Sequence, residues 1–184
     1  MKKVFVFSGP SGVGKSTLIK YLLTNLEFVG MTISCTTRAP RFDEVHGVDY
    51  YFISSEEFEK LIKDGEFLEH VECYGNRYGT LKREVSNVLK SKDVCILDLE
   101  FEGAYNVISK GEVNFKSIGV LILPPSMKSL KNRLINRKTE TEESLKKRIK
   151  ESFRVKEIAN YEYVIINDDL EKSKQDITDI ITSA

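Results

Sequence analysis

Short apolar runs and amphipathic stretches alternate along most of the chain. The apolar runs are rich in β-branched and aromatic residues and are bounded by turn signals, which is typical of buried strands. Five such strands are predicted, at residues 4–7, 31–36, 93–99, 117–123 and 163–166. Because helical patterns separate them, we expect an α/β fold in which a mostly parallel five-stranded sheet has helices on both faces.

The helices are predicted where apolar residues recur every three or four positions. The first begins at about Lys15 and ends near Asn25, and four others are expected at residues 55–63, 81–89, 104–109 and 170–181. Pro124 and Pro125 end the fourth strand, since proline cannot continue the hydrogen-bonding pattern of a strand. Residues 126–161 follow as a charged helical stretch with a polar break near Lys138.

A second group of short elements lies between the second and third strands of the predicted sheet. Residues 37–47 form a polar loop, and residues 50–53 are predicted as a short aromatic strand. Apolar and polar residues alternate over residues 67–74, which indicates a half-exposed strand. These elements predict a compact mixed α/β insert in the fold.

The helix of this insert has clear end signals. Ser54 followed three residues later by Glu57 matches a capping box, and Gly65 marks the end of the helix. The pattern therefore predicts a short helix over residues 55–63.

The turn between the first strand and the first helix carries the most specific motif. It matches the phosphate-binding pattern G-x-x-x-x-G-K-[ST], with Gly9, Gly14, Lys15 and Ser16 at the fixed positions. Glycines let successive backbone N–H groups point at one anion, and the helix N-terminus adds its partial positive charge. We expect Lys15 to bind the β- and γ-phosphates of a nucleotide and the Ser16 hydroxyl to bind Mg²⁺.

Composition narrows the range of functions. The 184 residues suffice for one domain, and 28 basic and 28 acidic residues give a formal net charge of zero, which favours neither nucleic acid nor an anionic membrane as a partner. Cys35, Cys73 and Cys95 lack C-x-x-C spacing, which argues against a disulfide framework or a zinc site. We expect no signal peptide or transmembrane helix, and a cytoplasmic location.

The insert supplies a second set of phosphate donors. These are Ser34, Arg38, Arg41, Tyr50 and Tyr78. They suit a second phosphate because the planar guanidinium group matches phosphate oxygens and tyrosine adds a hydroxyl donor. The alternative for Arg38 and Arg41 is a solvated loop with surface ion pairs, and the arginines alone do not decide between the two.

Taken together and in this order, the motifs closely resemble those of guanylate kinases. The stretches that carry the resemblance are residues 8–17, 34–41, 44–52, 75–80 and 167–170, and the similarity runs from the first strand to the last helix. The resemblance implies ATP-dependent phosphorylation of GMP to GDP in purine nucleotide metabolism, with Mg²⁺ as the cofactor. We expect dGMP to be accepted as well, because none of the residues assigned below reads the 2′-hydroxyl.

The resemblance also implies a single domain with three parts. The core, of the P-loop NTPase type, is expected at about residues 1–33, 81–125 and 158–184, the GMP-binding insert at about 34–80, and a helical lid at about 126–157. We expect a monomer, with a dimer as the alternative, and ATP and GMP as the only partners.

Residue roles are carried over position by position from the family pattern. The ATP site comprises Gly9, Ser11, Gly12, Val13, Gly14, Lys15, Ser16, Thr17, Arg133, Arg137 and Asn167, the last as the adenine contact. The GMP phosphate is held by Ser34, Arg38, Arg41, Tyr50 and Tyr78, the guanine by Glu69 and Thr80, and Asp98 and Glu100 lie beside GMP. Catalytic charge comes from Lys15, Arg38 and the lid arginines Arg133, Arg137 and Arg148, and Asp98 with Ser16 holds Mg²⁺, mostly through water.

The sequence departs from the family pattern at a few positions. Glu100 stands where an aspartate is usual, Glu102 where a glutamine is usual, Thr80 where many members have serine, and Lys138 where the lid motif has glycine. Glu100 keeps the charge but reaches one methylene further. Neither Thr80 nor Lys138 removes a needed donor.

Rival functions differ in features that the sequence contains or lacks. A non-catalytic, phosphopeptide-binding module of the same fold typically loses the phosphate loop and the lid arginines, and both are present here. A same-fold kinase of another phosphorylated acceptor, such as a ribose bisphosphate, is disfavoured by the guanine-facing Glu69, whose own alternative is a solvated residue on a half-exposed strand. A GTPase switch is disfavoured because the N-K-x-D motif is missing.

Overall fold

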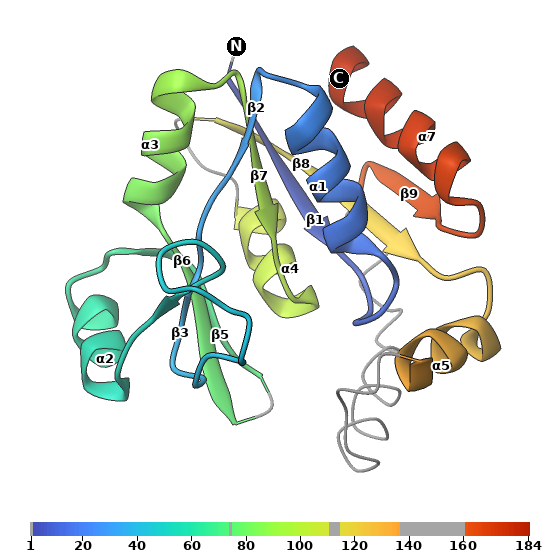
Figure 1. Ribbon diagram of the computed structural model, residues 1–184. Coiled ribbons are helices and arrows are strands. Elements are labelled where there is room, and N and C mark those ends of the chain that lie inside the picture. Colours follow the sequence, from blue (N-terminus) through green and yellow to red (C-terminus); the bar gives the residue numbers. More distant parts are fainter. Residues whose placement is uncertain (1, 74, 111–114, 137–160) are drawn as a thin grey trace.

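The computed structural model describes residues 2–73, 75–110, 115–136 and 161–184 (Figure 1). Five strands form a parallel sheet in the spatial order β2 (Val29–Met31), β7 (Val94–Asp98), β1 (Lys3–Ser8), β8 (Lys116–Leu123) and β9 (Tyr163–Ile166). All neighbouring pairs in this sheet run parallel, which confirms the predicted fold class. The central position of β1 explains its continuous apolar run, because Val4, Phe5, Val6 and Phe7 are all fully buried.

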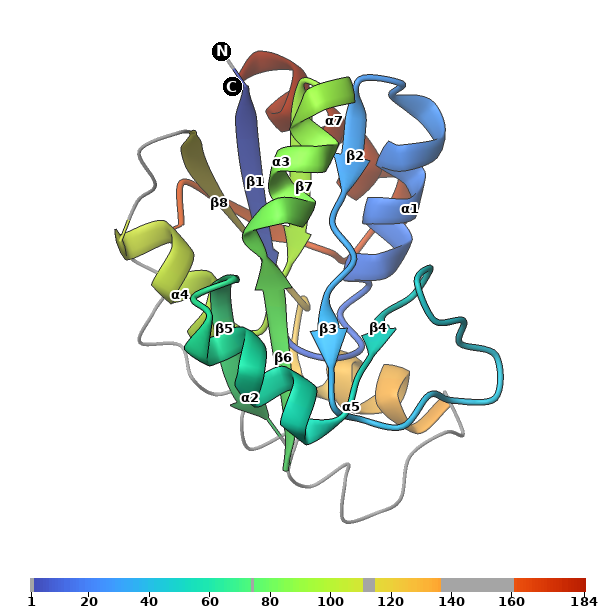
Figure 2. The same cartoon turned by 90° about the vertical axis from the view of Figure 1, so that its left-hand side faces the viewer.

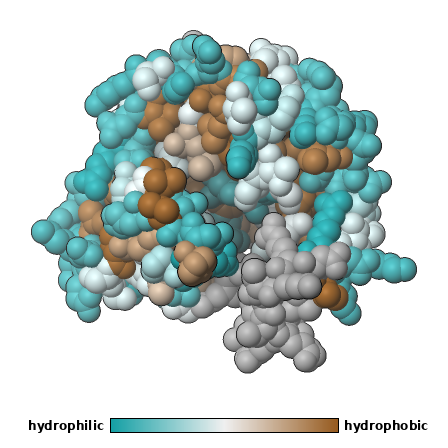
Figure 3. All heavy atoms as spheres, viewed as in Figure 1, coloured by the Kyte–Doolittle hydropathy of each residue, from teal (hydrophilic) through white to brown (hydrophobic). Residues whose placement is uncertain are grey.

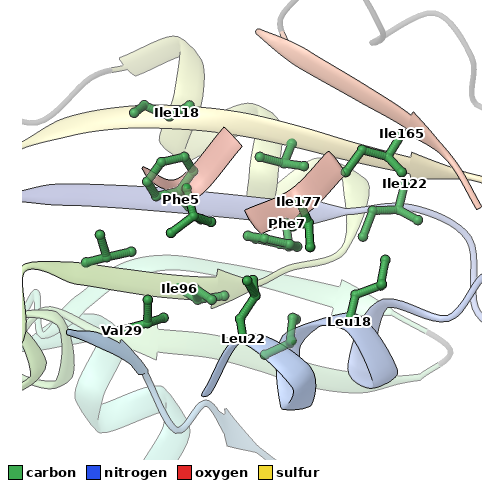
Figure 4. Packing of buried hydrophobic residues seen from close by; sticks show 14 of the residues in the cluster. Phe5, Phe7, Leu18, Leu22, Val29, Ile96, Ile118, Ile122, Ile165 and Ile177 are labelled. Atoms are coloured by element: carbon green, nitrogen blue, oxygen red, sulfur yellow. The ribbon is translucent and has the colours of Figure 1, made fainter. Parts of the chain in front are cut away.

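Helices cover both faces of the sheet (Figures 1 and 2). On one face lie α1 (Lys15–Asn25) and α7 (Leu170–Ser183), and on the other lie α3 (Lys82–Ser91) and α4 (Phe101–Lys110). Because side chains alternate along a strand, β1 contributes to both cores. Phe5 and Phe7 pack with Leu22 on the α1 side (Figure 4), whereas Val4 and Val6 belong to the core on the α4 side.

A further helix, α5 (Met127–Asn136), follows β8 beyond the carboxyl edge of the sheet (Figure 1). Its Leu130 is buried in the core on the α1 side, which fixes the helix to the body of the protein. The rest of the predicted charged stretch, including the break at Lys138, lies outside the described residues.

A second sheet lies in the insert, which the sequence predicts at about residues 34–80. Its strands are β4 (Tyr51–Phe52), β3 (Cys35–Thr36), β6 (Asn76–Leu81) and β5 (Phe67–Cys73), in this spatial order. Helix α2 (Ser55–Lys63) covers this sheet, with the ring of Phe58 stacked on that of Phe67 at 4.5 Å between centroids. The predicted mixed insert is therefore present, with its own small core.

One predicted strand is divided between the two sheets. The sequence predicts a single strand over residues 31–36, but β2 ends at Met31 and β3 begins at Cys35. Thr32 still donates its backbone N–H to Ile96 in the parallel sheet, and Cys35 already pairs with Gly79 in the second sheet. The chain crosses from one sheet to the other with no turn residue to mark the crossing, so the sequence pattern does not reveal it.

Two other elements differ from the expectation. Strand β6 was not predicted, since its Gly79 and polar residues are typical of a loop. Glycine is required at position 79 because a Cβ there would lie 2.8 Å from the Phe67 ring. Helix α4 begins at Phe101, three residues before the predicted start at Ala104, so that Gly103 lies inside the helix. Among the described residues, no helix is both long and apolar enough to cross a membrane.

The capping box of α2 gives a test of local stability. The Ser54 hydroxyl accepts from the Glu57 backbone N–H at 3.1 Å, and the Glu57 carboxylate accepts from the Ser54 backbone N–H at 2.8 Å. We expect Ser54→Ala to lower the free energy of unfolding by about 1 kcal/mol, because an N–H of the first turn loses its partner. Urea unfolding measures this, and Ser55→Ala, one residue further along, is the control and should change it by less than about 0.5 kcal/mol.

Candidate active site

The phosphate-binding loop connects β1 to α1 across the carboxyl edge of the parallel sheet. Gly9 has a φ of 146° and packs so closely on β8 that a Cβ there would collide with the Ile122 carbonyl oxygen. Gly14 adopts a left-handed conformation as the N-cap of α1. Both positions therefore require glycine, in agreement with the predicted motif.

The N-terminus of α1 is arranged to bind an anion. Helix α1 begins at Lys15, has no side-chain cap and carries no acidic residue in its first turn. Ser16 and Thr17 are exposed there, while Ser11 and Gly12 are partly exposed in the loop. The N–H groups and partial positive charge of a helix start attract phosphate, so this is where the predicted nucleotide phosphates would lie.

Lys15 and Asp98 meet beside this loop. The Lys15 ammonium donates to the Gly9 carbonyl at 2.7 Å and lies 4.0 Å from the Asp98 carboxylate at the end of β7. One third of the Asp98 side chain is exposed to solvent. Partial loss of water around its carboxyl raises the pKa, and the Lys15 charge opposes that shift. Figure 3 shows that the molecular surface has a hollow between the insert and α1.

In the insert, a carboxylate holds the two predicted phosphate-binding arginines. Glu44 accepts from the Arg38 guanidinium at 2.8 Å and from the Arg41 backbone N–H at 2.8 Å, and the Arg41 guanidinium lies 3.8 Å away. Burial raises the pKa of the Glu44 carboxyl, but the hydrogen bonds from Arg38 and Arg41 outweigh it and leave the pKa below its ordinary value. Glu44 therefore stays charged and orients Arg38.

Aromatic rings complete the surroundings of Arg38. Its guanidinium carbon lies 5.6 Å from the Tyr50 ring centroid and 5.7 Å from that of Phe52, within cation–π range. The Tyr50 and Tyr78 rings are edge to face at 6.2 Å. Burial raises the pKa of Tyr50 to about 12, with a further contribution from the Asp98 charge, so its hydroxyl remains a donor. The charge of Asp98, at the end of β7 in the parallel sheet, therefore acts on Tyr50 in the insert.

Glu69 lies at the other end of the insert site and is not solvated. Its residue surface is only 7% exposed, and burial raises the pKa of its carboxyl to about 7, although hydrogen bonds from the side chain and backbone of Thr80 lower it. The Thr80 hydroxyl lies 3.5 Å from that of Ser34. The alternative of a solvated Glu69 is therefore wrong, because this carboxyl is buried beside a hydroxyl.

Asn167 and Arg133 brace the back of the phosphate loop. The Asn167 amide donates to the Val13 carbonyl at 2.7 Å, and the Arg133 guanidinium donates to the carbonyls of Val13 at 3.3 Å and Asn167 at 2.9 Å. Asn167 is buried. These bonds link α5 and the end of β9 to the loop.

Comparison with known proteins identifies the family. The family model described as guanylate kinase matches residues 1–184. The chain belongs to the guanylate kinase family. It is 46% identical over 183 residues to the guanylate kinase of Clostridium tetani, which covers 98% of this chain and 85% of that protein. It is 41% identical over 181 residues to that of Clostridioides difficile, which covers 98% and 87%.

A solved structure agrees with this assignment. The crystal structure of guanylate kinase from Anaplasma phagocytophilum matches with a TM-score of 0.75 and 29% identity, covering 99% of this chain and 85% of that one. The family and fold predicted from the motifs are confirmed. Guanylate kinases phosphorylate GMP to GDP with ATP, the activity that the resemblance implied.

The predicted site residues of this guanylate kinase form three groups. The first group contains the phosphate loop and Asp98. The second contains Arg38, Tyr50 and Tyr78, and the third contains Glu69, Thr80 and Ser34. Arg41 is exposed at the edge of the insert, and Glu100, also exposed, contributes its charge to the surroundings of Tyr50. Arg137 and Arg148 lie outside the described residues.

Sequence reasoning gave Glu44 no role. Its contact with Arg38 arises because the polar loop folds back on itself, so the two residues meet although six positions separate them. The sequence offers one indication of this contact, since Glu44 is an acidic residue only three positions after Arg41.

The buried Glu69 makes folding stability depend on pH. Its pKa is about 7 in the folded protein and 4.5 ordinarily, so between these values the folded state keeps a proton that the unfolded state has lost. Stability should therefore fall as pH rises through this window, by at most about 3 kcal/mol from this group. Glu69→Gln should remove that part of the fall.

Urea unfolding between about pH 5 and pH 8 measures the difference from wild type. Glu72→Gln, at an exposed position of the same strand, is the control and should keep the wild-type slope. A Glu69→Gln protein with the wild-type slope would show that burial does not raise this pKa.

Proposed function

We propose that this chain transfers the γ-phosphoryl group of ATP to GMP at the hollow between the insert and α1, with ATP held by the phosphate loop and GMP by the insert. The observation that carries this proposal is the pairing of Lys15 of the loop with Asp98 at 4.0 Å, since the same Asp98 charge also acts on Tyr50 of the insert. Donor and acceptor sites that meet in this way suit direct transfer between two bound nucleotides.

The proposed ATP site is built on α1 and its loop. Backbone N–H groups of the loop and the Lys15 ammonium bind the β- and γ-phosphates, where negative charge has to be neutralised. Arg133 and Asn167 hold the loop through the Val13 carbonyl, and Asn167 lies at the proposed adenine contact. Arg137 and Arg148, which lie outside the described residues, are proposed to add charge from the lid.

The proposed GMP site uses the insert from end to end. Arg38, Arg41, Tyr50 and Tyr78 bind the acceptor phosphate, together with the Ser34 hydroxyl. Glu69 accepts hydrogen bonds from the guanine N1–H and 2-amine, and the Thr80 hydroxyl donates to O6. None of these residues reads the 2′-hydroxyl, so dGMP is also accepted.

A Mg²⁺ ion is proposed to accompany ATP. Ser16 is exposed in the first turn of α1, and the Asp98 carboxylate lies beside the loop, so the available donors are oxygens, which Mg²⁺ prefers. Among the described residues no group of three His, Cys, Asp or Glu side chains could form a protein cage, and Mg²⁺ with nucleotide phosphates needs none, because it keeps several waters. When bound, this ion neutralises phosphate charge.

The chemical step follows from these placements. An oxygen of the GMP phosphate attacks the γ-phosphorus while the bond to the β–γ bridging oxygen breaks, giving GDP and ADP. Arg38 offsets the charge of the attacking phosphate, and Lys15 offsets charge on the transferred group. Glu44 keeps the guanidinium of Arg38 in place for this role.

The proposed division of the chain follows the same roles. Residues of about 1–33, 81–125 and 158–184 form the core, about 34–80 the GMP-binding insert, and about 126–157 the lid. A panel of ATP with GMP, dGMP, AMP, UMP and dTMP, followed by ADP release, tests the function. Turnover with GMP and dGMP alone is expected, and no turnover with GMP would contradict it.

Removing the loop lysine separates catalysis from folding. We expect Lys15→Ala to lower kcat by about a thousandfold or more, since a charge on the transferred phosphoryl group is lost. The protein should stay folded, with the free energy of unfolding lowered by no more than about 2 kcal/mol, because Lys15 loses its hydrogen bond to the Gly9 carbonyl and its pairing with Asp98 but no core contact. Lys20→Ala, at an exposed position of the same helix, is the control for both measurements. Near-normal turnover of folded Lys15→Ala would refute the mechanism.

Base selection tests the role of Glu69. Adenine has an acceptor at N1 and lacks the 2-amine, so a buried carboxylate facing it would be left without a partner, and we expect wild type to prefer GMP over AMP by about 10⁴ in kcat/KM. Glu69→Ala should reduce this preference at least about tenfold. Glu72→Ala on the same strand should keep it, and an unchanged preference in Glu69→Ala would remove the guanine-reading role.

A further inference from the structure

Gly103, in the first turn of α4, is the residue that lies against the Glu69 carboxyl. Helix α4 packs on β5, and both Gly103 and Glu69 are buried where the two elements meet. A Cβ at Gly103 would lie 2.5 Å from Glu69 Oε2 and 3.3 Å from its carboxyl carbon. Ordinary contacts of a Cβ are 3.4–4 Å, so the carboxyl occupies the space that a side chain at this position would fill.

The backbone gives no other reason for a glycine here. Gly103 is helical and is not among the glycines with positive φ, so any L-residue can adopt its conformation. Glycine is among the least favourable residues inside a helix, and the next residue, Ala104, is among the best. A glycine inside a helix usually allows another group to pack close to the helix backbone, and at Gly103 that group is the Glu69 carboxylate.

The carboxyl of Glu69 is enclosed from two sides. Thr80, its neighbour across the strand pair, hydrogen-bonds it through the side chain and the backbone, and α4 lies against it at Gly103. The atom nearest to an added Cβ is the far end of a flexible side chain. An alanine is therefore accommodated by moving the carboxyl and not by unfolding the helix.

We propose that Gly103 is a positioning residue for the Glu69 carboxyl and thereby sets how well the acceptor site distinguishes guanine from adenine. This inference rests on the proposed guanine-reading role of Glu69. A shift of about 1 Å in a group that must meet two donors of a bound base is enough to weaken both hydrogen bonds.

Four proteins test the proposal: wild type, Gly103→Ala, Glu69→Ala and the double variant. We expect Gly103→Ala to lower kcat/KM for GMP by about tenfold or more, chiefly through KM for GMP, with KM for ATP within about twofold of wild type. The preference for GMP over AMP should fall with it. In the Glu69→Ala background, adding Gly103→Ala should change none of these values by more than about twofold, because the carboxyl that it displaces is gone.

Two results would overturn the proposal. One is a Gly103→Ala protein within about twofold of wild type for GMP, and the other is an equal loss from Gly103→Ala whether or not Glu69 is present. If Glu69 does not read guanine at all, the result is different, because Glu69→Ala alone would then keep the wild-type preference for GMP over AMP. An effective Glu69→Ala combined with an ineffective Gly103→Ala leaves the role of Glu69 standing and rejects the positioning by Gly103.

Folding controls complete the experiment. Ser109→Ala places alanine at an exposed position of the same helix and should leave activity unchanged. Circular dichroism and thermal melting check each variant. If Gly103→Ala fails to fold, the proposal requires the double variant with Glu69→Ala to fold again, and a double variant that also fails to fold overturns it.

Discussion

The contact between Gly9 and the Ile122 carbonyl is the constraint on which the site depends. Because the chain leaves β1 in direct contact with β8, the loop turns over the carboxyl edge of the sheet and α1 begins there. The same turn places Lys15 beside Asp98 and leaves the Val13 carbonyl within reach of Asn167. The contacts of the Val13 carbonyl with Asn167 and Arg133 hold the loop in this position.

Features that depend on local sequence could be predicted. Continuous apolar runs with β-branched residues identified four strands of the parallel sheet, β1, β7, β8 and β9, because strands buried on both faces have no polar side. Ser54 and Glu57 located the start of α2 through their reciprocal hydrogen bonds. The glycine-rich motif located the start of α1 at Lys15 and the loop before it, since glycine at these positions is a requirement of the backbone.

Features that depend on pairing between distant segments could not be predicted. Residues 31–36 form one uninterrupted β-like run, and only the separate partners of its two halves divide it between sheets. The alternation along β5 revealed a two-faced strand but not that Glu69 shares the buried face with Phe67 and Val71. The meeting of Arg38 with Glu44 depends on a loop conformation, for which a single sequence gives no periodic signal.

The place where the insert joins the core has a consequence for how such an enzyme can change. Ser34 and Thr80, at the two ends of the insert, lie side by side with their hydroxyls 3.5 Å apart. The segment between them therefore leaves and re-enters the parallel-sheet body at one point, as an independent module does. A cassette replacement of this segment would therefore change the proposed acceptor site in one step, provided that the residue at position 103 of α4, which lies against Glu69 from the core, is matched to the new segment.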